Sequence, residues 1–177
     1  MAYRCRAIGA SFAEAADILG ATARLCDLTV VSQPEPTQAI SDNTMPLEIL
    51  LRSGGPVLVV PYTFHDALKL GRVGILWDGS RLAARALRDA MPLIFKANAI
   101  TILTVNQPVS PEVSPDRLAA HLAKLGLPAR TVLLQADHAS IQPTILSAAA
   151  RRGARSACRG RLWPLPFSGS RAWRRYP

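Results

Sequence analysis

The sequence predicts an α/β fold: an open, mostly parallel sheet with helices on both faces, of the Rossmann-like kind. Short apolar runs of strand length alternate along the chain with amphipathic segments of helix length. This alternation is typical of right-handed βαβ crossovers and a parallel sheet. Apolar residues make up 49% of the chain and charged residues 19%, a composition that favours a buried, helix-covered sheet over a disordered chain.

The first third of the chain predicts two helices and two strands. Residues 10–24 have the apolar periodicity of an amphipathic helix, and residues 28–31 follow as a short buried strand that ends at a proline-containing loop. Residues 46–52 predict a second helix, with Thr44 as N-cap and a proline in its first turn. Residues 56–61 are continuously apolar between two prolines, as expected of a strand covered on both faces.

The rest of the chain predicts three further strand and helix pairs. Strands are expected at residues 73–77, 99–105 and 129–134, and the helices after them at 81–95, 115–125 and 140–152. Ser80 and Ser114 are placed to cap the first two of these helices, and Gly126 to end the second. Pro92 predicts a kink in the first.

Charge is concentrated at the C-terminal end. The formal net charge is +9, but residues 151–177 hold eight of the 21 basic residues and no acid, which leaves 13 basic and 12 acidic residues in the remainder.

Three cysteines form no C-x-x-C pair, so a disulfide framework and a zinc site are not expected, and a reducing cytoplasm fits best. Acidic residues interrupt the apolar N-terminal stretch, and no apolar run has the length of a membrane span, so neither export nor membrane insertion is expected.

Several segments resemble a known family. Residues 73–80 (VGILWDGS), with the helix after them and residues 100–105 (ITILTV), resemble the opening of a universal stress protein domain. Residues 26–31 (CDLTVV) and 50–61 (LLRSGGPVLVVP) resemble the fourth strand, last helix and fifth strand that close such a domain. The resemblance covers residues 13–153, and the order of the pieces is that of tandem members of the family.

This order implies four regions. Residues 1–62 correspond to the C-terminal part of one repeat, 63–71 to a linker and 72–153 to the N-terminal part of a second repeat, while 154–177 form a non-native, irregular tail. The second repeat then lacks its last two strands, which exposes a sheet edge. We expect the strands of the first repeat to dock beside the strand at residues 73–77 and complete a composite five-stranded sheet.

The resemblance implies a nucleotide site whose phosphate half is missing. ATP-binding members carry a glycine loop, G-x2-G-x9-G-[ST], after the fourth strand, and its main-chain amides receive the phosphates. Residues 32–36 (SQPEP) occupy that place in the first repeat without a glycine. In the second repeat the chain runs instead into the arginine-rich tail. No cofactor is therefore expected, although ATP remains compatible with the fold.

The tail has an explanation in the reading frame. One permissible coding sequence for residues 154–177, read one base later, encodes a strand-like DLLVV followed by a G-x2-G-x9-G loop. Both missing pieces appear in the right order at the expected place. We therefore hypothesise that a single-base shift near codon 154 replaced the nucleotide loop.

The candidate site residues are Asp78, Gly79, Ser80 and Val105. In the family the position of Asp78 helps to hold the nucleoside, and the main chain at the position of Val105 meets the adenine. The alternative is structural: Asp78 and Ser80 cap the turn into the helix, and Gly79 serves a tight turn. His65, His121 and His138 have no metal-ligand spacing, and no serine lies in a nucleophile-elbow motif.

The resulting functional prediction is a non-enzymatic stress-response or binding module with a degenerate or lost ATP site. The alternative is a nucleic-acid-binding protein acting through the tail, where four aromatic residues alternate with arginines. Incidental polyanion binding is expected of such a tail in either case. A homodimer and weak adenine nucleotide binding both remain open.

Overall fold

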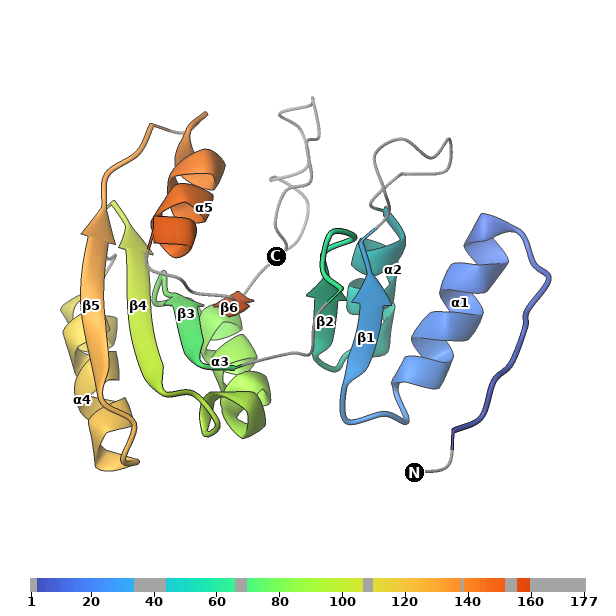
Figure 1. Ribbon diagram of the computed structural model, residues 1–177, viewed down its shortest axis with the longest axis horizontal. Helices are drawn as coiled ribbons and strands as arrows, with labels where there is room; N and C mark the ends of the chain where they lie inside the picture. The colour runs from blue at the N-terminus through green and yellow to red at the C-terminus, as the bar shows by residue number, and fades with distance from the viewer. Residues whose placement is uncertain are drawn as a thin grey trace. The chain divides into compact units, whose positions relative to one another are not determined.

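The computed structural model describes residues 3–33, 44–65, 70–106, 110–137, 139–151 and 156–159. The chain divides into two compact units, Met1–Asp66 (unit 1) and Ala67–Pro177 (unit 2). The division falls inside the segment predicted as a linker. Helices and strands alternate in both units and every described strand pair is parallel, which confirms the predicted α/β class (Figure 1).

Unit 1 contains two helices and a two-stranded parallel sheet. Its elements are α1 (Phe12–Ala23), β1 (Thr29–Ser32), α2 (Thr44–Ser53) and β2 (Val57–Val60). Thr44 is already helical, so the predicted N-cap lies inside α2. Strand β1 pairs with β2 in a register that sets Val30 opposite Leu58.

The two helices of unit 1 pack closely against each other. A Cβ on Gly20 of α1 would lie 2.5 Å from the Cβ of Arg52 on α2, so the absence of a side chain at Gly20 permits the approach. The Arg52 guanidinium pairs with Asp17 across the two helices and with Glu48 in its own helix at 2.8 Å. These contacts hold α1 beside α2.

Unit 2 is built on a four-stranded parallel sheet. Its order is β5-β4-β3-β6, formed by β3 (Arg72–Leu76), β4 (Ala99–Val105), β5 (Ala129–Leu134) and β6 (Ser156–Arg159). The helices between them are α3 (Arg81–Ile94), α4 (Pro115–Lys124) and α5 (Ile141–Arg151), and a short 3-10 turn, η1 (Pro111–Val113), precedes α4. Ser80 and Ser114 cap α3 and α4 as predicted, and Gly126 follows α4 with a positive φ of 77°.

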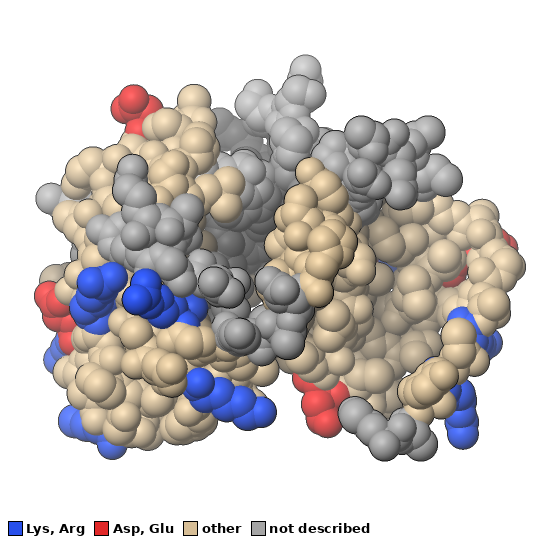
Figure 2. All heavy atoms as spheres, viewed as in Figure 1, with Lys and Arg blue, Asp and Glu red and all other residues tan. Residues whose placement is uncertain are grey.

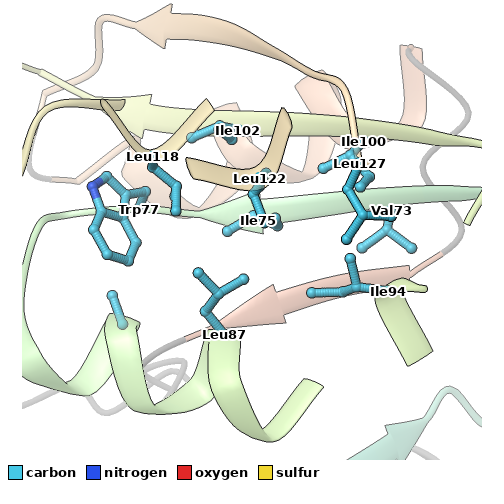
Figure 3. Packing of buried hydrophobic residues seen from close by; sticks show 11 residues of the cluster. Val73, Ile75, Trp77, Leu87, Ile94, Ile100, Ile102, Leu118, Leu122 and Leu127 are labelled. Carbon is cyan, nitrogen blue, oxygen red and sulfur yellow. The ribbon is translucent and has the colours of Figure 1, made fainter. Parts of the chain in front are cut away.

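The core of unit 2 lies between the sheet and the helices α3 and α4. Alternate residues of β3 and β4 meet leucines and isoleucines of both helices on this face (Figure 3). On the opposite face Leu103 is buried and α5 contacts β4, with Ile145 and Ala148 buried. Helices therefore cover both faces of the sheet, which is the doubly wound arrangement that the sequence predicts.

A truncation at the centre of this core should be costly. Ile102 lies on β4, one of the two inner strands, and is 0% exposed. We expect Ile102→Ala to lower the free energy of unfolding by about 2–5 kcal/mol, because it removes buried methyl groups and leaves a cavity. Leu133→Ala on the edge strand β5, where the side chain is 54% exposed, is the matched control and should cost less than about 1 kcal/mol. Urea unfolding followed by circular dichroism measures both, and equal losses would contradict the assignment of the core.

The free edge of β3 is occupied by a different strand from the one expected. Strand β6 pairs with β3 from Val73↔Ser156 to Leu76↔Arg159, whereas β1 and β2 form a sheet of their own. The predicted composite five-stranded sheet is therefore wrong. Its premise also fails for residues 156–159, which were expected to be irregular. The physical reason is that the unpaired N–H and C=O groups of an edge strand accept any extended segment, and the crossover through α5 delivers one. Residues 160–177 lie outside the described residues.

Candidate functional site

The candidate site lies at the carboxyl ends of β3 and β4. From β3 the chain proceeds through β4 to β5 on one side, and then crosses to β6 on the other side of β3. The direction of winding thus reverses between β3 and β6. In open α/β sheets ligands bind outside the carboxyl ends of the strands at such a reversal. Asp78, Gly79 and Ser80 directly follow β3 at this position.

The turn after β3 is held by its own polar side chains. The Asp78 carboxylate accepts a hydrogen bond from the main-chain N–H of Ser80 at 2.8 Å. The Ser80 hydroxyl accepts one from the N–H of Ala83 at 3.1 Å, which is the N-cap bond of α3. These are the bonds that the capping interpretation predicts. They engage two of the candidate ligand-binding groups in local structure.

Gly79 is required by the turn and by a neighbouring loop. Its φ of 73° lies in the left-handed region that favours glycine. A Cβ at this position would lie 2.7 Å from Cγ2 of Val113, the last residue of η1. Protein atoms therefore occupy the space that a side chain would fill. The sequence pattern gave no indication of this contact.

Trp77 ties the same loop to the sheet. Its indole Nε1 donates a hydrogen bond to the Val113 carbonyl at 2.7 Å, while its ring lies buried at one end of the core cluster near Leu118 (Figure 3). The segment between β4 and α4 is therefore anchored beside the end of β3. Sequence analysis assigned Trp77 to the strand without a partner, because the contact joins residues 36 positions apart.

Val105 directs its main chain toward the end of β3. The Leu103 carbonyl accepts a hydrogen bond from the N–H of Trp77, and the N–H of Asn106 donates to Leu134 of β5. The main-chain N–H and C=O groups of successive residues in a strand point toward opposite neighbouring strands. Those of Val105 therefore point toward β3, as those of Leu103 do. The register with β3 ends at Leu76↔Leu103, so Val105 extends beyond it. The structure thus brings Val105 and Asp78 to the same edge of adjacent strands.

Two further polar residues at the end of β4 were missed by the sequence analysis. Asn106 has a positive φ of 59°, and its side-chain oxygen accepts a hydrogen bond from Ala136 at 3.2 Å. This bond fixes the loop after β5 against the end of β4. Thr104 is 2% exposed, and its hydroxyl has no hydrogen-bond partner among the described residues. Asn and Thr are common in loops and strands, so the sequence alone does not distinguish these two residues from others of their type.

Charged side chains of both signs follow the carboxyl ends of the strands, since Arg81 and Arg117 stand in the first turns of α3 and α4. Carboxylates follow the ends of three strands: Asp78 after β3, Glu112 and Asp116 after β4, and Asp137 after β5. The Ser110 hydroxyl donates to the Glu112 carboxylate and lowers the pKa of Glu112, which keeps that carboxylate ionised.

The other positions considered from the sequence are the histidines and the two places where a glycine loop would stand. The described residues contain no group of three His, Cys, Asp or Glu side chains that could hold a metal ion. His65 and His121 are exposed, and His138 lies outside the described residues. The loop at residues 34–36 and the chain after Arg159, where the glycine loops would stand, also lie outside them. Within the part that is described, no helix is both long and apolar enough to cross a membrane.

Comparison with known proteins gives no assignment. No protein-family model, no curated protein and no solved structure matches this chain.

Proposed function

We propose that this chain is a non-enzymatic binding module of the universal stress type that acts in a stress response. We further propose that its ATP-binding site is degenerate and no longer binds the triphosphate. The proposal rests on the resemblance of residues 13–153 to that family. Its main support in the structure is the turn after β3. There the Asp78 carboxylate and the Ser80 hydroxyl are bonded to the main chain of the turn and of α3.

Residues that could contact a nucleoside are present in such a site, whereas a loop that could bind phosphate is not. Asp78 and the main chain of Val105 stand at the same edge of adjacent strands, as nucleoside contacts would require. A phosphate half needs a run of main-chain amides and a positive local field. The sequence contains no glycine loop at either expected place. Weak nucleoside contacts without phosphate contacts are the expected result.

An enzymatic role is not part of the proposal. Phosphoryl transfer needs groups that stabilise charge on the phosphate oxygens, usually with a metal ion. The described residues contain no group of three His, Cys, Asp or Glu side chains that could hold such an ion. We therefore propose that the chain acts by binding and not by hydrolysing nucleotide.

Titration with nucleotides tests the proposal. We expect a fluorescent ATP analogue to bind with a Kd weaker than about 1 mM, corresponding to less than about 4 kcal/mol of binding free energy. Adenosine should compete as well as ATP does, because the triphosphate adds no favourable contact. Fluorescence anisotropy of the purified full chain provides the measurement. A micromolar Kd that is lost when the triphosphate is removed would overturn the proposal.

A further inference from the structure

The solvent-facing side of α3 is a row of arginines. Within Arg81–Ile94 the residues classed as exposed are Arg81, Arg85, Arg88 and Pro92. Their spacing of four, three and four residues places them on one line along a helix of 3.6 residues per turn. Phe95, which is 57% exposed and keeps helical backbone angles, continues the line by three residues. We call Arg81, Arg85 and Arg88 the arginine row.

The arginine row opposes the stability of its own helix. Arg81 occupies the first turn, where the positive end of the helix dipole disfavours a cation, and no acidic residue is present in that turn. Arg81 and Arg85 are four residues apart and Arg85 and Arg88 three, so like charges are neighbours on the helix surface. An ion pair of 3.6 Å joins Arg85 to Asp89 at the side of the row. Counting Asp89 and Asp78, which precedes the helix, against the three arginines leaves a net charge of +1 (3 − 2) on this side of α3.

Helix α4 of the same unit shows the usual arrangement. Its exposed residues include Asp116 in the first turn and Lys124 in the last, each placed favourably for the dipole, with both signs of charge on one face. Lysine and arginine side chains are prominent in Figure 2 over the half of the view in which α3, α4 and β5 lie. The single-signed face of α3 is therefore not shared by α4.

We propose that the arginine row is a docking surface for an acidic helix of a partner protein. The row from Arg81 to Arg88 is about 10 Å long at 1.5 Å per residue and one side chain wide, which matches carboxylates spaced one turn apart on another helix. Arginine presents a planar fork of donors that fits a carboxylate bidentately. Phe95 gives the far end of the row an apolar contact for the same partner.

Two other anionic partners fit this surface less well. Duplex nucleic acid is held through several phosphate contacts, commonly six to ten, which exceeds the three cations of the row. A membrane-surface helix buries an apolar face in the lipid. The apolar face of α3 instead packs against the sheet, with Ala83, Leu87 and Ile94 in the core. The charge and the narrow width of the row together favour a protein helix.

Binding of a designed peptide tests the inference. The probe is an alanine-based helical peptide of about 20 residues, with three glutamates spaced four and three residues apart and one leucine seven residues further along. Anisotropy is measured with the full chain at about 0.05 M salt, where exposed ion pairs are less screened. The triple variant Arg81→Gln/Arg85→Gln/Arg88→Gln should weaken binding about tenfold or more.

The matched control removes three arginines from the C-terminal segment. Arg171→Gln/Arg174→Gln/Arg175→Gln changes the net charge by the same amount and should alter the affinity by less than about twofold. A peptide with the same glutamates at irregular spacing should bind the wild-type chain as weakly as the designed peptide binds the first variant. Circular dichroism should show the first variant folded, since the substitution relieves like-charge repulsion.

Three outcomes would overturn the inference. Equal losses in the two triple variants would show general charge attraction. Equal binding of both peptides would show that spacing on the helix is not recognised. Tighter binding of a duplex oligonucleotide or of phosphatidylserine vesicles, lost in the first variant, would assign the row to another class of partner.

Discussion

Trp77→Ala should lower the free energy of unfolding of unit 2 by about 3–5 kcal/mol, the largest loss expected from a single truncation here. The indole ring is buried at the end of the core cluster, and its N–H holds the Val113 carbonyl at 2.7 Å. The substitution leaves a cavity and also releases the segment before α4 from the end of β3. Urea unfolding followed by far-ultraviolet circular dichroism measures the loss.

The conservative variant separates the two contributions of Trp77. Trp77→Phe keeps an aromatic ring in the core but removes the donor to Val113, so we expect a loss of about 1–3 kcal/mol. Equal losses for the alanine and phenylalanine variants would show that burial of the ring contributes little. A loss below about 1 kcal/mol for alanine would contradict the position of Trp77 in the core.

Gly79→Ala should destabilise unit 2 by about 2–5 kcal/mol. The φ of 73° costs a residue with a Cβ about 1–2 kcal/mol. The new Cβ would also lie 2.7 Å from Val113 Cγ2, and relief requires η1 to shift, at a further cost of about 1–3 kcal/mol. The same unfolding measurement applies.

Gly126→Ala is the matched control for this prediction. Its φ is 77°, but no atom lies within 4 Å of the added Cβ, so the loss should come from the backbone alone, at about 1 kcal/mol. In the double variant Gly79→Ala/Val113→Ala the contact is removed, and the two losses should be less than additive. Strict additivity would show that Val113 does not restrict residue 79.

The local pattern of the sequence predicted most of the elements of unit 2. Ser80 and Ser114 cap their helices because a hydroxyl placed just before a helix can accept from its first free N–H groups. Gly126 ends α4 because it adopts a positive φ without cost. Residues 99–105 form a strand with the predicted bounds, as a seven-residue apolar run between turns should.

Contacts between residues far apart in the sequence could not be predicted from this local pattern. The bond from Trp77 to Val113, the packing of Val113 against Gly79 and the buried hydroxyl of Thr104 depend on residues brought together by folding. The partner of β3 was mistaken for a similar reason. Edge pairing depends on which extended segment the crossover delivers, and the composition of residues 154–177 indicated an irregular segment.

The position of β6 shows how little the pairing with β3 depends on which side chains residues 156–159 carry. In the coding sequence hypothesised for the tail, the shifted reading of codons 156–159 would encode Leu-Leu-Val-Val. The chain as it stands forms a strand over the same four residues, beside β3. A ladder of peptide groups is formed by the backbone, which every codon supplies alike except that for proline. If the hypothesised shift of reading frame occurred, it would have replaced a binding loop and still left a strand paired with β3.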